Sequence, residues 1–228
     1  KINVSSAGTM LSFMEKPNFK MSIGFAQYSA EGNLCGDTIK TINDSRGHMI
    51  FIISDGMGKG SRAALDGAMG AGLLSKLLSA GFGFDSSLKV VNSALLVKSH
   101  EESLATLDCI RVDLFSGKCE FYKAGAPKSY VVKENSLTKC ELTSMPAGIL
   151  RGVEFAKRTT LLNTDDEIIM MSDGITDVGD DWLEEFLKLE TSFDPNEKAK
   201  AILRLALENS DEKHRDDMSV IVAKMIEK

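Results

Sequence analysis

Aspartate residues stand at the ends of two apolar segments, and their position there is the chemically informative feature of this sequence. Residues 50–55 run four apolar residues and a serine into Asp55, which Gly56 follows. Residues 168–173 repeat this arrangement, with Asp173 before another glycine. A carboxylate at the end of a buried strand is costly unless a cation pairs with it, and neither apolar run contains lysine or arginine. A divalent cation is therefore the expected partner.

Further aspartates extend this pattern into a ligand set made of oxygen atoms. Asp37 follows a glycine ahead of the first segment, and Asp216 and Asp217 open the last apolar strand of the chain. Clustered aspartates without histidine or cysteine suit Mg²⁺ or Mn²⁺ and argue against zinc. Two such ions about 3.5–4 Å apart form the usual clamp for hydrolysis of a phosphate ester. The sequence therefore predicts a two-metal centre for phosphate chemistry.

Each of these motifs also has a purely structural interpretation. One Ser-Asp-Gly is more often a turn than a metal site, but two copies at strand ends, together with the other aspartates, favour the metal site. The glycine-rich residues 56–60 are not a P-loop, because glycine follows the lysine where that loop needs Ser or Thr. His48, His100 and His214 are scattered and are expected to be solvated or structural; only His214, beside Asp216, is kept as a candidate proton donor.

Composition restricts the fold and the kind of partner. The 228 residues include 27 Lys and Arg against 33 Asp and Glu, a formal net charge of −6, which disfavours nucleic-acid binding. No apolar run reaches membrane-spanning length, so this segment is not expected to insert into a membrane. The chain begins at Lys1, which suggests a piece of a longer protein. Its 4 cysteines form no CxxC pair and are expected to be reduced and mostly buried, as in a cytosolic protein.

Strand and helix patterns occur in groups along the chain. Strands are expected at residues 20–28, 38–43, 48–54, 105–113, 118–124, 128–133, 154–162, 167–172 and 218–224. Helices are expected at residues 61–80, 86–98, 181–189 and 196–209. Meandering strands with helices grouped between them indicate an α+β fold of antiparallel sheets with helices outside.

The first expected helix has two kinds of packing residue. Its large apolar residues recur mostly at four-residue steps and are expected to form the buried face: Leu65, Met69, Leu73, Leu77 and Leu78. Its glycines keep the helix thin and should allow close packing: Gly67, Gly70 and Gly72. The helix is therefore expected to lie close against a neighbouring element.

Taken in order, the motifs resemble those of the metal-dependent PP2C-type (PPM) serine/threonine phosphatases, in the bacterial branch of stage II sporulation protein E and the stress-response regulators. The matching segments lie at residues 36–37, 53–60 with Ala63 and Ala64 beyond, 105–108, 124–127, 146–149, 171–174 and 216–220. Each segment is weak alone, but the ordered set is specific and covers the chain from about Met21 onward. Asp-Gly-Met-Gly and Ser-Leu-Ala-Thr-Leu-Asp are more similar to the sporulation protein than to its stress-response relatives.

This resemblance implies a four-layer αββα sandwich, with two antiparallel sheets flanked by helices on both sides. Residues 1–20 would be a linker or fragment end, and residues 21–228 the phosphatase domain. The metal pair would lie at one end of the sandwich. The helices after Gly60 and Ser86 would correspond to the pair that moves in this branch and controls assembly of the metal site.

The resemblance also implies roles for individual residues. Asp55 would bridge both ions, and the Gly56 carbonyl would bind one of them. Asp173 and Asp216 would hold the other ion, with Asp217 as the alternative to Asp216. Asp55, Asp173 and Asp216 would thus be the catalytic residues, through the metals that they hold. A further ligand, direct or through water, would be Asp37.

Finally, the resemblance implies an activity and partners. Water activated by two Mn²⁺ or Mg²⁺ ions would hydrolyse phosphoserine or phosphothreonine without a phosphoenzyme. The substrate would be a phosphorylated STAS-type anti-sigma-factor antagonist, and a homodimer is compatible with the family. The domain would be cytoplasmic, with the parent protein anchored to a membrane through its N-terminal region.

Two other classes of function remain open. A catalytically silent binding domain is disfavoured by the intact aspartates. A calcium-stabilised module is disfavoured by the lack of an Asp-x-Asp-x-Asp-Gly run.

Overall fold

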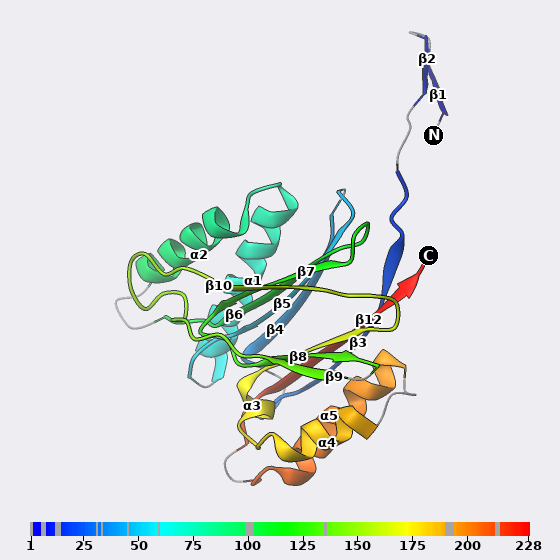
Figure 1. Ribbon diagram of the computed structural model, residues 1–228. Helices are drawn as coiled ribbons and strands as arrows, with labels where there is room; N and C mark the ends of the chain where they lie inside the picture. The colour runs from blue at the N-terminus through cyan, green and yellow to red at the C-terminus, as the bar shows by residue number, and fades with distance from the viewer. Residues whose placement is uncertain are drawn as a thin grey trace.

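Two five-stranded antiparallel sheets lie face to face, with helices on both outer sides (Figure 1). The computed structural model describes residues 2–5, 8–11, 15–30, 32, 34–44, 46–58, 60–98, 103–134, 136–189, 194–212 and 215–228. Three buried apolar clusters fill the spaces between the layers, one between the sheets and one under each helical layer. The expected four-layer αββα sandwich is confirmed.

The first sheet holds the strand that leads into Asp55. In spatial order its strands are β10 (Ala156–Leu161), β7 (Lys118–Ala124), β6 (Leu107–Asp113), β5 (His48–Asp55) and β4 (Asp37–Asn43). β5 is apolar along its length because β4 and β6 flank it and both of its faces are covered. Pairing of β4 with β5 sets Asp37 directly opposite Asp55.

The second sheet holds the strand that leads into Asp173. In spatial order its strands are β3 (Phe19–Tyr28), β12 (Met218–Glu227), β11 (Glu167–Met171), β8 (Ser129–Lys133) and β9 (Ser136–Cys140). All five residues of β11 are buried. The sequence analysis did not predict β9, an edge strand in which only Cys140 is fully buried, so no apolar run marks it.

The helices begin and end within two residues of their expected positions. α1 (Gly60–Ser79) and α2 (Phe84–Lys98) cover the first sheet, and α4 (Asp181–Leu189) and α5 (Pro195–Asn209) cover the second (Figure 1). α5 begins at a capping aspartate, Asp194, whose side chain accepts hydrogen bonds from two backbone N–H groups. The four-residue helix α3 (Asp173–Thr176) was not expected, because it is too short to show a helical period.

The apolar face expected for α1 is confirmed in part, since Leu78 lies in the buried core and Met69, Leu73 and Leu77 pack against it, whereas Leu65 does not. Leu65 is 56% exposed, and Met69, Leu73 and Leu77 are only partly buried; of the expected set, only Leu78 is fully buried. The buried face consists mainly of small residues: Ala63, Asp66, Gly67, Gly70, Ala71, Leu74 and Leu78. Small residues replace leucine here because the helix axis lies too close to the sheet for longer side chains.

Backbone contacts show how close this approach is. A Cβ atom on Gly67 would overlap the carbonyl oxygen of Gly36, and one on Gly70 would lie 2.9 Å from the Ser54 hydroxyl. The expected packing role of these two glycines is confirmed. Gly72 differs, because a Cβ there would meet nothing within 4 Å. α1 therefore rests directly on the backbone of β4 and β5.

The remaining sequence features have simple places in the fold. All 4 cysteines are free, and Cys109, Cys119 and Cys140 are buried, as expected. Strands β1 (Ile2–Ser5) and β2 (Gly8–Leu11) pair with each other, apart from the sandwich (Figure 1). Within the described residues, no helix combines the length and apolar character needed to cross a bilayer.

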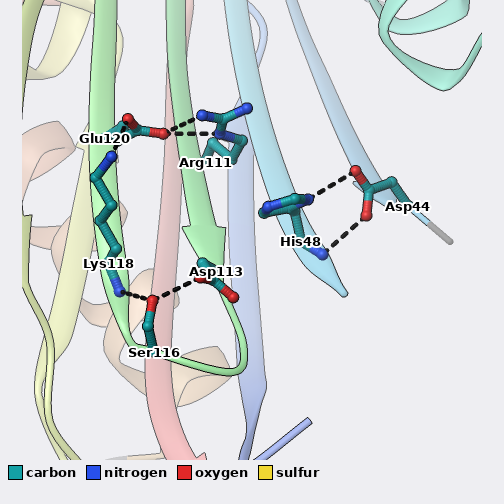
Figure 2. Close-up of polar contacts among 7 residues, drawn as sticks. All are labelled: Asp44, His48, Arg111, Asp113, Ser116, Lys118 and Glu120. Atoms are coloured by element: carbon teal, nitrogen blue, oxygen red, sulfur yellow. Dashed lines mark hydrogen bonds and ion pairs between the residues drawn. The ribbon is translucent and has the colours of Figure 1, made fainter. Parts of the chain in front are cut away.

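His48 has a structural role at the end of β5 that lies farthest from Asp55. Its backbone N–H donates to Asp44 at 2.8 Å, and its Nδ1 lies 3.0 Å from the same carboxylate (Figure 2). Beside this pair, Arg111 and Lys118 both bind Glu120. These contacts fasten strand ends remote from the aspartates, as the sequence analysis expected for His48. His100 and His214 lie outside the described residues.

Candidate metal centre

Four strand ends bring aspartates from both sheets to one end of the sandwich. Asp37 begins β4 and Asp55 ends β5, while Asp173 follows β11 and Asp217 precedes the neighbouring β12. A Cβ atom on Gly36 would lie 3.1 Å from Asp217 Oδ2 and 3.5 Å from Asp55 Oδ1. The carboxylates of the two sheets therefore face each other across a short gap.

Asp55 experiences the strongest repulsion in this cluster. Burial is the largest cause that raises its pKa to about 9, and neighbouring carboxylates raise it further: Asp173, Asp37, Asp216 and Asp217. Carboxylates this close can all be ionised together only if a cation neutralises them. The electrostatics thus make this end of the sandwich a candidate cation site.

Asp37 is the most deeply buried of these carboxylates, at 5% exposure. Burial raises its pKa to about 7, with a further contribution from the charges of Asp173 and Asp217. The hydroxyls of Ser172 and Ser219 lie beside it and oppose this rise, yet neither makes a hydrogen bond of ordinary geometry to its oxygen atoms. Buried carboxylate oxygens in this state call for a cation or an ordered water as partner.

Asp173 is held at the start of α3. Burial raises its pKa, and the charges of Asp216 and Asp177 raise it further. Its Oδ1 accepts a hydrogen bond from the Gly174 N–H at 2.9 Å. A Cβ atom on Gly174 would overlap the Asp217 carbonyl oxygen, so this turn lies directly against the segment that precedes β12.

The consecutive residues Asp216 and Asp217 have different environments. Asp217 accepts a hydrogen bond at each carboxylate oxygen, from the Ala30 N–H at 2.7 Å and from the Gly36 N–H. Asp216 is exposed, and its Oδ1 accepts from the Asp217 N–H at 2.8 Å. Asp217 is therefore committed to holding backbone segments together, whereas the Asp216 carboxylate lies open to the solvent side of the cluster.

Gly56 lies where any side chain would collide with α1. A Cβ atom there would overlap the Ala63 carbonyl oxygen, and the Gly56 N–H donates to the Gly36 carbonyl at 3.3 Å. Glycine at this position therefore allows the start of α1 to contact the backbone that carries Asp37 and Asp55.

Two polar residues that the sequence analysis did not assign hold the aspartates in place. The Asp55 N–H donates to Thr106 Oγ1 at 3.0 Å, and the Thr106 N–H donates to the Asp55 carbonyl at 2.8 Å. Gln27 Nε2 donates to the Asp37 carbonyl at 3.1 Å and to Ser219 Oγ at 2.9 Å. Both roles depend on pairing between distant strands. Thr106 lies in the matching segment 105–108, but nothing in that segment indicates that it contacts Asp55.

The donor set fits a hard divalent cation. The converging side chains are all carboxylates, and the buried oxygens of Asp37 have no donor among the described residues. As the side chains stand in the described part of the chain, no group of three or more His, Cys, Asp or Glu residues is close enough together to hold a metal ion. Mg²⁺ is usually held by one or two carboxylates and keeps several waters, so a centre of this kind needs water to complete its coordination.

The carboxylate cluster predicts an unusual pH dependence for the metal-free protein. Because Asp37 and Asp55 have raised pKa values, of about 7 and about 9, the folded state binds more protons than the unfolded state above pH ~4. The contribution of these two groups to the stability of the folded state is fully present below that pH. It is lost as the pH rises through their pKa values in the folded state. The free energy of unfolding should fall by about 1.4 kcal/mol per pH unit for each group still protonated in the fold.

Urea unfolding in chelator at pH 5, 6 and 7 measures this effect. The double variant Asp37→Asn/Asp55→Asn is the control, since it lacks both titrating groups. The wild-type protein should lose stability relative to this variant over that range. A constant difference between the two proteins would contradict the prediction.

Comparison with known proteins agrees with this arrangement. The family model described as Stage II sporulation protein E (SpoIIE) matches residues 45–226. Stage II sporulation protein E of Bacillus subtilis (strain 168) is 28% identical over 222 residues, which is 94% of this chain and 27% of that protein. The chain therefore spans little more than a quarter of the length of that relative.

Solved structures show the same fold. The PP2C phosphatase domain of SpoIIE from Bacillus subtilis, solved with a fragment of its regulatory domain, is 27% identical and superposes with a TM-score of 0.84, covering 93% of this chain and 64% of that one. The catalytic domain of the serine/threonine phosphatase PstP, solved with 2 manganese ions, is 18% identical with a TM-score of 0.74, covering 92% of this chain and 100% of that one.

Proposed function

Because the chain belongs to the stage II sporulation protein E family and has the fold of a PP2C-type phosphatase domain, we propose that it is a metal-dependent protein phosphatase that hydrolyses phosphoserine or phosphothreonine. The observation that carries this proposal is the convergence of buried aspartates from both sheets. Their mutual repulsion and the undonated oxygens of Asp37 support a site for divalent cations. The two manganese ions bound by PstP support a pair of Mn²⁺ or Mg²⁺ ions here.

We assign the ligands from the environment of each residue. Asp55 lies between the two sheets, where its carboxylate can contact both ions, and its neighbour Gly56 offers a backbone carbonyl. Asp173 and the exposed Asp216 are proposed for the second ion. The charge of each raises the pKa of Asp55, and the charge of Asp216 also raises the pKa of Asp173. Asp37 is proposed as a direct or water-mediated ligand. Asp216 is preferred to Asp217, which stays the alternative, because both Asp217 oxygens already accept backbone hydrogen bonds.

When bound, two dications would lower the pKa of a coordinated water and neutralise charge on the phosphoryl oxygens. The chain's own contribution is to hold the metal ligands and to orient their carboxylates. Thr106 fixes the Asp55 backbone, and Gln27 fixes that of Asp37, so the carboxylates keep their spacing. In this assignment the aspartates are metal ligands and not nucleophiles.

The proposed substrate is a phosphorylated STAS-type anti-sigma-factor antagonist, as family membership suggests. With a net charge of −6, the chain would rely on the metal ions to attract an anionic phosphoprotein. Free, mostly buried thiols support the expectation of a reducing, cytoplasmic setting.

Phosphate release from such a phosphoserine protein, with Mn²⁺ added and then removed by chelator, tests the function. We expect turnover that appears with Mn²⁺, disappears with chelator and returns when Mn²⁺ is restored. p-Nitrophenyl phosphate is the matched control, since it reports the chemistry without protein recognition. If only p-nitrophenyl phosphate is hydrolysed, the phosphatase activity would be supported and the proposed protein substrate would be rejected.

Calorimetry on the same samples separates the other classes of function. A folded domain that binds Mn²⁺ but releases no phosphate from either substrate would be the silent binding domain. Preference for Ca²⁺ over Mn²⁺, without turnover, would indicate the calcium-stabilised module.

A further inference from the structure

One buried side chain of α2 binds the loop that lies between this helix and the metal centre. Asn92 is 4% exposed. Its Nδ2 donates to the Leu150 carbonyl at 2.9 Å, and its Oδ1 accepts from the Gly148 N–H at 2.7 Å. Both polar ends of the amide thus bind residues 146–150, which are part of the loop between β9 and β10.

This loop is in turn paired with residues 103–106. Ala147 and Ala105 exchange two backbone hydrogen bonds, at 2.9 and 3.0 Å. Gly148 has a φ of +94°, and a Cβ atom there would overlap the Ser103 carbonyl oxygen. Only glycine allows the loop to lie this close to residues 103–106.

Residues 103–106 are then paired with the metal-binding segment. Met57 N–H donates to the Leu104 carbonyl at 3.0 Å, and Thr106 N–H donates to the Asp55 carbonyl at 2.8 Å. Gly56 and Ala105 form a bridge between these hydrogen bonds. A continuous set of hydrogen bonds therefore runs from Asn92, through the two loop segments, to the backbone of Asp55 and Gly56.

From this geometry we propose that Asn92 is a positioning residue for the metal centre. By fixing residues 146–150 against residues 103–106, its amide sets the position of the Asp55 and Gly56 backbone. The inference rests on the proposed function because it concerns the same centre. A side chain that only stabilised the fold would leave metal affinity unchanged when removed.

The variant Asn92→Ala tests this proposal, and Ser87→Ala is its matched control. Ser87 lies on the same helix, is fully buried, and its hydroxyl has no hydrogen-bond partner among the described residues. Asn92→Ala should weaken calorimetric Mn²⁺ affinity by about 10-fold, the lower end of the loss seen when a group bonded directly to a metal ligand is removed, because Asn92 acts through two loop segments. In metal-free protein it should also speed amide hydrogen exchange at Met57 and Thr106.

Ser87→Ala should leave both quantities as in the wild type. A milder variant, Asn92→Ser, should fall between Asn92→Ala and wild type, and it serves if Asn92→Ala is too unstable to study. Thermal unfolding monitors the fold of each variant.

Three outcomes decide the matter. A lowered melting temperature with wild-type Mn²⁺ affinity and wild-type exchange at Met57 and Thr106 would overturn the positioning role and leave a structural one. Wild-type protein that binds Mn²⁺ but releases no phosphate would overturn the proposed function alone. The Mn²⁺ affinity and amide hydrogen exchange of the variants would still test the role of Asn92. Wild-type protein that binds no Mn²⁺ would overturn both.

Discussion

Replacement of Asp55 by asparagine should lower kcat for phosphate release by about 1000-fold or more at saturating Mn²⁺. Asp55 is the carboxylate on which all its neighbours act, and we assign it to both ions. Loss of metal stabilisation of the transition state is worth several kcal/mol, and about 4 kcal/mol corresponds to this factor. Steady-state hydrolysis of p-nitrophenyl phosphate measures the effect, and calorimetry should show weakened Mn²⁺ binding.

The same substitution should leave the metal-free protein folded and at least as stable at neutral pH. The pKa of Asp55 is raised to about 9 in the metal-free fold, so asparagine replaces an uncharged carboxyl group and removes the cost of keeping that group protonated. Asp85→Asn is the control: Asp85 is exposed on α2 and pairs with Lys157, far from the proposed ligands in the sequence and on a different element. Its effect on kcat should be negligible. Full Mn²⁺-dependent activity of Asp55→Asn would overturn the metal assignment.

Replacement of Lys123 by alanine should lower the free energy of unfolding by about 3–5 kcal/mol, the usual cost of leaving one partner of a buried ion pair alone. Lys123 is fully buried, and its Nζ donates to Asp108 at 2.7 Å, to the Pro127 carbonyl at 2.6 Å and to Ser129 Oγ at 2.8 Å. Its removal leaves Asp108, at 1% exposure, without its cation. Urea unfolding measures the loss.

The double variant Lys123→Met/Asp108→Leu is the matched control. Replacement of both partners by apolar side chains of similar size is often neutral or stabilising, so it should recover most of the lost stability. A Lys123→Ala protein within about 1 kcal/mol of wild type would show that the pair contributes little, in contrast to the usual range.

The fold and the principal aspartates could be predicted from the sequence because their signals are local. Asp55 and Asp173 each follow an apolar run and precede a glycine, so one short pattern predicts the strand, the candidate ligand and the turn. The ordered motifs then indicate which sheets must face each other. Strand β9 was not predicted, because an edge strand needs no apolar run.

Other features depend on distant neighbours and have no local signal. Thr106 and Asn92 look like ordinary polar residues until strand pairing and helix packing bring them to Asp55 and Gly148. One residue of the expected α1 face, Leu65, was misjudged for a related reason. Hydrophobic periodicity assigns leucine to the interior, but a helix that rests on backbone buries glycine and alanine instead, and Leu65 remains exposed.

The two hydrogen bonds of Asp217 have a consequence for the geometry of the opening. Ala30 follows β3 of one sheet and Gly36 precedes β4 of the other, so the connection between them is the crossover from sheet to sheet. One carboxylate from the start of β12 grips both ends of this crossover. At this end of the sandwich the distance between the segment that precedes β12 and the segment that enters β4 is thereby limited to the reach of one aspartate side chain.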